Sequence, residues 1–520
     1  MNLRLQAACA LAAALVLSFP LATHADPLTV KTQLGKAHGK TINNGKVRAW
    51  LGLPYAAPPI GDLRWKAPQP AIKWSGERDA TSFGAHCAQN HVFDDMIFQD
   101  KGDSEDCLFL NVYEPTDATA KSKLPVMFWI HGGGYSGGGS DEPRHNGDFL
   151  PLKGVVLVTI NYRLGIFGFL ATADLAKEAN GAAGNYGLMD MVAGLQWVKT
   201  NIKEFGGDPG NVTIFGESAG SFAVSTLMAS PMAQGLFQKA IGESGGAIGR
   251  GPLNLDSLAD RETKDAQWVA GLNVTSLAQL RALSTQAILD AAKKPGAGFP
   301  PDVDGKLLTE SVDATYAAGK QAHVPLLAGW NADEGSFFAM RGMTVDQWKA
   351  MASTQFKDRS DAFLKLYPGD TDAQALRSAI DFGSDQFIAL GTWRWLDAQR
   401  KTGGSPVYRY HFELAATPSK FHPGTFAFHS DDIEYVFGTL DTRPGWTPSP
   451  DDRKLSDAMM TYWTNFAKTG DPNGGGLPNW PKYNDDGYPL IHLNTSITSG
   501  PDTLRARDEF LEAGMPAMRF

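Results

Sequence analysis

The pentapeptide Gly216-Glu217-Ser218-Ala219-Gly220 constrains the fold of this chain more than any other feature of the sequence. It follows the apolar run at 212–215 and precedes a stretch with helical spacing of apolar residues. In a G-x-S-x-G motif in this context, the serine occupies a sharp strand-to-helix turn whose small flanking residues let neighbouring backbone pass close by. The turn lifts the hydroxyl clear of the sheet and points the positive end of a helix towards it. An ordinary glycine-rich turn with an N-capping serine is the alternative interpretation.

Other apolar runs predict further strands of the same sheet. Short runs that are apolar on both faces and flanked by turns are typical of central strands covered by helices. The predicted strands of this type lie at 126–130, 155–160, 212–215, 239–242 and 325–329. Helical spacing over 188–198, and from Ser218 past Leu227, places helices between strands and therefore predicts an α/β fold with a mostly parallel sheet.

Three segments outside these runs have a different character. Residues 26–120 are rich in Gly and Pro with short alternating stretches, which predicts an antiparallel β-rich segment leading into the sheet. Residues 250–320 and 340–400 are rich in Ala with helical spacing. We expect these two segments to be helical insertions around a pocket.

Size and charge limit the organisation and the partners of the chain. It has 520 residues, of which 43% are hydrophobic and 20% charged, and no internal repeat or low-complexity linker divides it. We therefore expect a single domain over 26–520. The net charge of −9 disfavours nucleic acid and anionic lipid as partners. The sequence carries no signal for an oligomeric state.

The first 25 residues have the organisation of a secretory signal peptide. Arg4 precedes an apolar stretch at 7–19, and Thr23-His24-Ala25 places small residues where a signal peptidase reads, with cleavage expected before Asp26. An uncleaved N-terminal anchor is the alternative, although the stretch is short for a membrane span. No later stretch is long and apolar enough to cross a membrane. We expect a secreted or periplasmic protein.

The cysteine count agrees with export. Of three cysteines, Cys9 leaves with the signal peptide and Cys87 and Cys107 remain, an even pair for an oxidising compartment. A bridge between them closes a loop of about 20 residues and is expected to contribute roughly 3 kcal/mol. Two free buried thiols are the alternative.

A second glycine motif follows the predicted strand at 126–130. His131-Gly132-Gly133-Gly134-Tyr135 provides backbone N–H groups of the kind that stabilise the negative oxygen formed when a serine attacks a carbonyl. We assign Gly133, Gly134 and Ala219 to this oxyanion hole. A flexible loop is the alternative, since Gly137-Gly138-Gly139 follows closely.

Several ordered motifs resemble those of the type-B carboxylesterase family, which includes cholinesterases and bacterial para-nitrobenzyl esterases. They are Leu53-Pro54-Tyr55-Ala56-Ala57-Pro58-Pro59 with Leu63-Arg64-Trp65, Ser104-Glu105-Asp106-Cys107-Leu108 with Asn111, Asn161-Tyr162-Arg163, Gly184-Asn185-Tyr186-Gly187-Leu188, Phe205-Gly206-Gly207-Asp208-Pro209, Phe466-Ala467-Lys468-Thr469-Gly470-Asp471-Pro472-Asn473 and Trp480-Pro481. The resemblance covers nearly the whole mature chain and implies an α/β-hydrolase fold and carboxylic ester hydrolysis.

The resemblance also implies the partners of Ser218. The family's acid lies in a segment similar to 331–335, where Glu334 precedes the glycine; Asp333 is the close competitor. The family's histidine segment is similar to 428–438 and indicates His429, with His422 as the alternative. The resulting order of serine, acid and histidine is the one this fold requires. His429 then acts as general base and acid, and Glu334 orients the imidazole, through an acyl-enzyme.

Supporting residues follow from the same resemblance. It implies the Cys87–Cys107 disulfide and two buried ion pairs, Arg64–Glu105 and Arg163–Asp190. Glu217, Phe337 and Phe338 are candidates for lining the substrate pocket, with structural roles as the alternative. No metal or organic cofactor is expected, because the histidines and carboxylates show no metal-ligand spacing such as H-E-x-x-H.

The substrate class is narrowed by one departure from the cholinesterases. Their cation-binding tryptophan lies in the loop closed by the first disulfide, whereas the segment from Cys87 to Cys107 has no tryptophan and Ile97 stands near that position. Small-molecule carboxylic esters other than choline esters are the expected substrates. An esterase for a large polyester such as a mycotoxin, and a non-catalytic binding protein of the same family, are the alternatives.

Overall fold

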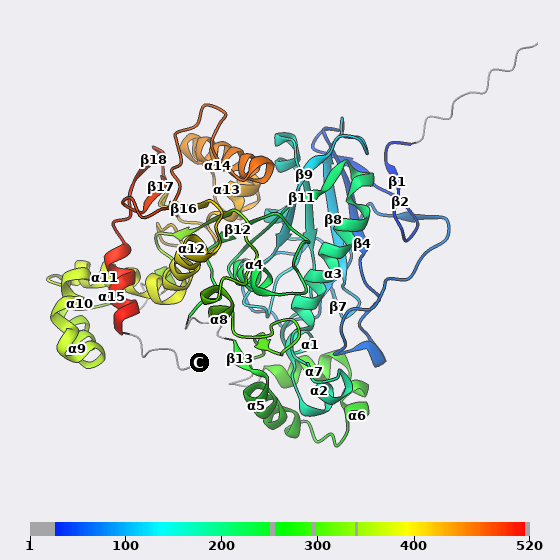
Figure 1. Ribbon diagram of the computed structural model, residues 1–520, viewed down its shortest axis with the longest axis horizontal. Coiled ribbons are helices and arrows are strands. Elements are labelled where there is room, and N and C mark those ends of the chain that lie inside the picture. The colour runs from blue at the N-terminus through cyan, green and yellow to red at the C-terminus, as the bar shows by residue number, and fades with distance from the viewer. Residues whose placement is uncertain (1–25, 250–254, 294–297, 338–341, 515–520) are drawn as a thin grey trace, which may run out of the picture.

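A mixed eleven-stranded sheet forms the centre of the computed structural model (Figure 1). The structure describes residues 26–249, 255–293, 298–337 and 342–514. In spatial order the strands are β18 (Thr498–Pro501), β17 (Pro489–Leu493), β16 (Val407–Phe412), β15 (Leu326–Asn331), β12 (Lys239–Glu243), β11 (Gly207–Glu217), β9 (Leu124–Ile130), β10 (Val156–Ile160), β8 (Phe109–Pro115), β4 (Val47–Pro54) and β3 (Lys40–Ile42).

The middle of this sheet is parallel and its two margins are antiparallel. Every neighbouring pair from β10 across to β17 is parallel, whereas β8 pairs antiparallel with β10 and with β4, and β18 pairs antiparallel with β17. The predicted α/β class with a mostly parallel sheet is confirmed. Each strand predicted from an apolar run is present, with its ends shifted by a few residues.

Both faces of the sheet are buried, which explains the continuous apolar runs. Along β9 the side chains of Val126, Phe128 and Ile130 join the larger hydrophobic cluster, while Met127 and Trp129 join the second cluster on the opposite face. Alternate side chains of a strand point to opposite faces, so a strand covered on both sides needs apolar residues throughout.

Helices cover the two faces. On one face lie α3 (Tyr186–Asn201) and α4 (Ala219–Ala229), both predicted from their spacing, and on the other lie α13 (Ile433–Phe437) and α14 (Pro450–Thr469) (Figure 1). The remaining helices are α1 (Gly165–Phe169), α2 (Ala173–Glu178), α5 (Leu258–Ala270), α6 (Leu277–Ala282), α7 (Thr285–Ala292), α8 (Val312–Ala317), α9 (Val345–Phe356), α10 (Ser360–Leu366), α11 (Asp372–Ser384), α12 (Leu390–Thr402) and α15 (Arg505–Gly514).

The two predicted insertions are helical and form separate projections. Helices α5 to α7 gather at the bottom of Figure 1, while α9 to α11 gather at its left beside α15. In the second insertion, the π-helical turn Asp385–Ala389 connects α11 to α12. This turn brings part of the insertion back towards the carboxyl ends of the central strands, where the candidate site lies.

The N-terminal segment is β-rich but only partly antiparallel. Strand β4 pairs antiparallel with β8, as predicted. However, β2 (Lys36–His38) pairs with β5 (Glu77–Asp79), and β6 (His86–Cys87) with β7 (Asp103–Ser104), in parallel. Long connections of this kind return the chain in the same direction, which a short hairpin cannot do.

One disulfide and one buried ion pair lie within this N-terminal segment, and a second buried ion pair joins the chain after β10 to α3. Cys87 and Cys107 form a disulfide with a Cα–Cα distance of 4.9 Å. The two ion pairs implied by the family resemblance are present and buried: Arg64 Nη2 lies 2.5 Å from Glu105 Oε1, and Arg163 Nη2 lies 2.7 Å from Asp190 Oδ1. Because both partners are taken out of water, loss of one partner leaves an uncompensated charge.

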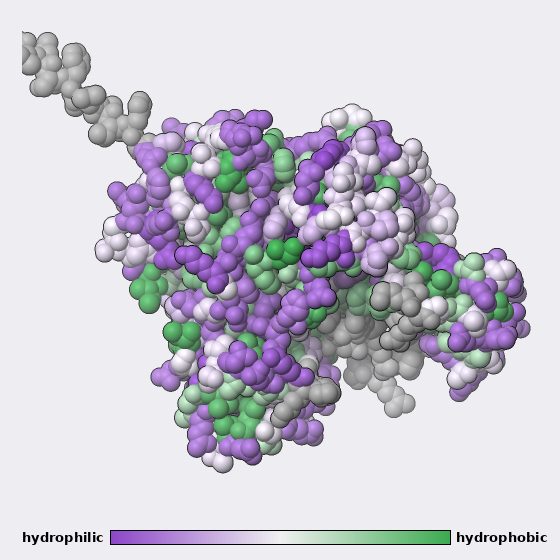
Figure 2. Space-filling view, turned by 180° about the vertical axis from the view of Figure 1, so that it is seen from behind, coloured by the Kyte–Doolittle hydropathy of each residue, from purple (hydrophilic) through white to green (hydrophobic). Residues whose placement is uncertain are grey.

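The surface seen in Figure 2 is mainly hydrophilic, with hydrophobic residues in small separate groups. Among the helices of the described residues, none combines the length and apolar character needed to cross a bilayer. The predicted signal peptide at 1–25 lies outside the described residues.

Candidate active site

The serine of the G-x-S-x-G motif lies on the turn between β11 and α4. Ser218 has φ 53° and ψ −122°, a backbone conformation that a side-chain-bearing residue rarely adopts. The turn needs small neighbours, because a Cβ on Gly216 would lie 2.5 Å, and one on Gly220 2.0 Å, from the carbonyl oxygen of Ile130. The Ser218 N–H donates to the carbonyl of Glu243 at 2.9 Å, which holds the turn against β12.

The predicted histidine reaches this serine from a distant part of the chain. His429 lies in the loop between β16 and α13, and its Nε2 is 2.8 Å from Ser218 Oγ. This distance is within hydrogen-bond range for an imidazole that removes a hydroxyl proton. The ring of Phe387 packs edge-on against the imidazole with a centroid distance of 5.0 Å and limits its movement.

The predicted acid lies on the other side of the imidazole. Glu334 follows β15, is fully buried, and places Oε2 2.6 Å from His429 Nδ1. Its second oxygen, Oε1, accepts hydrogen bonds from the Ser244 hydroxyl at 2.5 Å and from the Asn331 N–H at 2.8 Å. With both oxygens occupied, the carboxylate is fixed in the orientation that keeps the Nδ1 proton of the imidazole facing it.

The two competing assignments have other partners. The carboxylate of Asp333 pairs with Arg377 at 2.5 Å and accepts the Ala427 N–H at 2.9 Å. His422 stacks on Phe428 with a centroid distance of 3.6 Å. The geometry therefore brings Glu334 and His429, rather than Asp333 and His422, into one hydrogen-bonded chain with Ser218.

The glycine loop after β9 lies beside the serine. Gly133 and Gly134 both line the same cavity as Ser218, and both have positive φ angles, 100° and 62°. The Gly133 carbonyl accepts the N–H groups of Ser136 and Gly137, which closes the loop into a tight turn. Among the described residues, no acceptor takes the N–H of Gly133 or Gly134.

Ala219 supplies the third predicted donor. It is the first residue of α4, where a backbone N–H has no partner within the helix. The positive end of the helix dipole adds to the attraction for an anion at this point. The N–H groups of Gly133 and Gly134 at the cavity and that of Ala219 next to Ser218 are therefore the candidate donors, although they belong to segments more than 80 residues apart in the sequence.

Glu217 adds a second carboxylate next to the imidazole. Its Oε1 lies 3.5 Å from His429 Nε2, and the residue is only 2% exposed. Burial raises the pKa of Glu217 to about 8. Burial alone would lower the pKa of His429, but the Glu217 and Glu334 carboxylates outweigh this effect and raise it to about 9. The site therefore favours a positive charge on the imidazole.

The serine opens into a cavity of about 310 Å³. This volume suits a small ligand. The cavity is lined by Phe93, Asp95, Met96, Gly133, Gly134, Arg144, Glu217, Ser218, Phe222, Phe387, Ile388, His422, His429 and Ser430. Phe93 and Met96 come from the disulfide-closed loop, and Phe387 and Ile388 come from the π-helical turn. The described residues of the first insertion do not contribute to this lining.

The predicted pocket residues have different positions. Glu217 lines the cavity. Phe337 is 50% exposed and lies outside the lining, although its ring contacts Phe387 edge-on at 5.6 Å. Phe338 lies outside the described residues.

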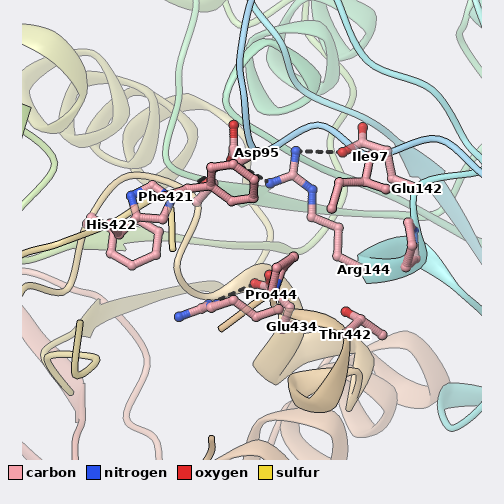
Figure 3. Close-up of a pocket in the computed structure, with 13 residues that line it drawn as sticks. Asp95, Ile97, Glu142, Arg144, Phe421, His422, Glu434, Thr442 and Pro444 are labelled. Carbon is pink, nitrogen blue, oxygen red and sulfur yellow. Dashed lines mark hydrogen bonds and ion pairs between the residues drawn. The ribbon is translucent and has the colours of Figure 1, made fainter. Parts of the chain in front are cut away.

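A smaller polar pocket of about 30 Å³ adjoins this cavity (Figure 3). Arg144 lies between Asp95 and Glu142, with Nη2 2.8 Å from Glu142 Oε2, and burial raises the pKa of Glu142 to about 7. Ile97 lines this pocket and not the cavity that contains Ser218. The small pocket has room for water but not for a substrate group.

Some residues that shape the site were not expected from the sequence. Ser244 and Asn331 hold the Glu334 carboxylate, and Phe387 packs on the imidazole. The only sequence signal for Ser244 is its position just after the apolar strand β12. This signal is weak, because many serines follow strands. Phe387 lies within an insertion whose helical spacing resembles ordinary core packing.

The strand-turn-helix serine and the helix-covered, mostly parallel sheet define an α/β hydrolase. Comparison with protein families matches residues 26–510 to the carboxylesterase family. Fumonisin B1 esterase from Sphingopyxis macrogoltabida is 37% identical over 504 residues, which cover 91% of this chain and 88% of that protein. Para-nitrobenzyl esterase from Bacillus subtilis is 36% identical over 487 residues, which cover 90% of this chain and 95% of that protein.

Solved structures agree with this comparison. A PNB esterase structure superposes with a TM-score of 0.79 at 33% identity, covering 94% of this chain and 100% of that chain. The chain belongs to the carboxylesterase family and is an enzyme that hydrolyses carboxylic esters.

Proposed function

We propose that Ser218, His429 and Glu334 carry out ester hydrolysis through an acyl-enzyme. The observation that carries this proposal is the continuous chain of hydrogen bonds from Ser218 Oγ through the imidazole to Glu334, with distances of 2.8 and 2.6 Å. A serine hydroxyl is a weak nucleophile at neutral pH, and an adjacent oriented base is the usual means of activating it.

In the proposed reaction, Ser218 Oγ attacks the ester carbonyl while His429 Nε2 takes the hydroxyl proton. The tetrahedral intermediate collapses when the imidazolium returns that proton to the leaving alcohol, which leaves the acyl group on Ser218. Water then attacks the acyl-enzyme with His429 again as base, and the acid is released. Glu334 keeps the imidazole in the correct tautomer and stabilises its positive charge in both halves of the reaction.

The N–H groups of Gly133, Gly134 and Ala219 are proposed to bind the negative oxygen of the intermediate. The two glycines line the cavity and their N–H groups have no acceptor among the described residues, and the Ala219 N–H lies at the start of α4 next to Ser218, which supports this role. Loss of one such donor in other enzymes costs about 3–4 kcal/mol of transition-state stabilisation.

Glu217 is proposed to assist by stabilising the imidazolium from the Nε2 side. At 3.5 Å it is too far for a short hydrogen bond but close enough for a strong interaction inside a buried site. Burial raises the pKa of Glu217 to about 8, so this stabilisation grows as the pH rises and the carboxyl ionises.

The cavity supports small-molecule esters with an apolar part as substrates. Phe93, Phe222 and Phe387 contribute aromatic surface to it. Fumonisin B1 is a further substrate to test, because an esterase named for it is similar to this chain. A non-catalytic binding role is less well supported, because all the groups needed for the reaction are present together.

Export and domain organisation are part of the same proposal. We infer that 1–25 is a cleaved signal peptide, that the mature enzyme is secreted or periplasmic, and that 26–520 acts as one domain. The family match begins at residue 26, directly after the expected cleavage site, which supports this division. Mass spectrometry of the exported protein, with Asp26 as the expected N-terminal residue, tests the cleavage.

The catalytic roles are tested by labelling and by a substrate panel. A fluorophosphonate probe should modify wild-type enzyme at Ser218 and should leave Ser218→Ala unmodified, with peptide mapping to locate the adduct. Hydrolysis of para-nitrophenyl esters of increasing acyl length should be lost in Ser218→Ala and His429→Gln. Ser75→Ala, which changes an exposed serine that does not line the cavity, is the control. Full hydrolysis by Ser218→Ala would exclude the proposal.

A further inference from the structure

A compact group of two histidines and one glutamate lies at the carboxyl end of neighbouring strands in the sheet. His411 is on β16 and His492 is on β17, and the two residues are directly opposite each other in the parallel register. Glu413 follows β16, and its N–H donates to the Leu493 carbonyl at 2.8 Å, which continues the extended backbone. Positions 411 and 413 therefore face the same side of the sheet as position 492.

The three side chains converge through the atoms that bind metals. His411 Nδ1 is 2.8 Å, and His492 Nδ1 is 2.6 Å, from the same oxygen, Oε1 of Glu413. The candidate ligand atoms all lie within 4.8 Å of one another. In a tetrahedral zinc site, ligand atoms are separated by about 3.3 Å. Opening each contact by roughly half an ångström would make room for the ion.

The group is accessible from solvent, so an ion has a route to it. The side chains of His411, His492 and Glu413 are 12%, 24% and 27% exposed. Binding needs no net loss of a proton from a neutral imidazole, because the proton on Nδ1 can move to Nε2 as Nδ1 becomes the ligand. The nearby cation Arg409 is already paired with the buried Asp502 and lies over the Trp330 ring.

The ligand types point to a particular class of ion. Two imidazoles and one carboxylate suit Zn²⁺ and similar transition metals, whereas Ca²⁺ and Mg²⁺ prefer sites made of oxygen ligands. A second group, His86, Asp100 and Asp141, has two carboxylates and one histidine and lies in a more buried region. The group at β16 and β17 has the better combination of ligand type and access.

We propose that His411, Glu413 and His492 form a binding site for a divalent transition-metal ion of the zinc type, with water in the fourth position. The ion links β16 to β17 and binds only the folded chain, so it stabilises the fold. The H-x-E spacing and the distant His492 explain why sequence motifs do not reveal the site. The site does not depend on the proposed esterase mechanism.

Cobalt titration of the metal-free, full mature enzyme tests the site. Co²⁺ in a tetrahedral site with nitrogen and oxygen ligands has a strong visible absorption band, and octahedral surface binding gives only a weak one. We expect one equivalent of Co²⁺ to produce the strong band and Zn²⁺ to remove it. Glu413→Gln and His492→Gln should each weaken binding by at least about tenfold. His91→Ala, which changes an exposed histidine paired with Asp94, should bind as wild type does.

Thermal unfolding provides a second measurement. Zn²⁺ should raise the midpoint temperature of unfolding of wild type and His91→Ala but leave that of Glu413→Gln unchanged. The absence of a saturable strong band in wild type would overturn the proposal. Equal cobalt affinity in wild type and Glu413→Gln would also overturn it, since this result indicates adventitious surface binding. The wild-type titration is decisive even where a variant fails to fold.

Discussion

Replacing Glu217 by Gln should move the acid limb of the kcat/KM profile to lower pH. The acid limb reports the pKa of the base in the free enzyme, which is His429 in the proposed mechanism. Glu217 raises that pKa because its negative charge favours the imidazolium form of His429. The Gln side chain has nearly the same shape but no charge, so it removes this contribution and little else.

The size of the shift follows from the distance. Two unit charges 3.5 Å apart interact by about 5 kcal/mol at an effective dielectric constant of about 20, which corresponds to roughly 3.5 pH units. This value is an upper bound, because burial raises the pKa of Glu217 itself to about 8 and the carboxyl is neutral over part of the range. We expect a downward shift of about 1 to 3 pH units.

The assay is hydrolysis of a para-nitrophenyl ester under kcat/KM conditions from acid to alkaline pH, corrected for the ionisation of the product and for spontaneous hydrolysis. Glu178→Gln is the matched control, since Glu178 pairs with Arg281 on the surface and should leave the limb where it is in wild type. A limb that stays in place, or moves upward, in a folded Glu217→Gln enzyme would refute the electrostatic argument.

Three further changes have expected outcomes. Gly133→Ala should reduce kcat roughly 10²–10³-fold, because the new Cβ would lie 2.1 Å from the Gly137 carbonyl oxygen and displace a proposed oxyanion donor. Gly137→Ala is the control, because its new Cβ would lie 3.2 Å from the nearest atom. Cys87→Ser with Cys107→Ser should lower the free energy of unfolding by about 3 kcal/mol in urea titrations, from a sequence separation of 20, and an unchanged midpoint would contradict this. Asp502→Asn should lower the free energy of unfolding by about 3–5 kcal/mol in the same titration, because it leaves the buried Arg409 unpaired. Asp441→Asn, at an exposed ion pair, should change that free energy little.

The central sheet was predictable because its strands have an unambiguous pattern. Strands such as β9 and β10 are buried on both faces, so their sequences are apolar throughout and stand out from helices and loops. The parallel pairs at 26–120 were not predictable, because short strands with mixed burial have no distinctive pattern and their pairing depends on long connections.

Only part of the geometry at Ser218 could be predicted from the sequence. The G-x-S-x-G turn has its own local pattern, and the family resemblance indicated Glu334 and His429. By contrast, the groups that position them, such as Ser244 and Phe387, are ordinary residue types whose contacts exist only in three dimensions. The same holds for His411, Glu413 and His492, which adjacent strands bring together from positions up to 81 residues apart.

The π-helical turn at Asp385–Ala389 makes the shape of the substrate cavity sensitive to chain length. Such a turn holds one residue more than the α-helix around it. Deleting one residue here would restore regular helix and change which side chains the turn presents to the site, while the helices on either side kept their phase. Phe387 would then leave the imidazole, and Ile388 would leave the cavity wall, while Ser218 and Glu334 kept their places. A single codon lost or gained in this segment would thus alter both the substrate cavity and the packing that holds the imidazole of His429.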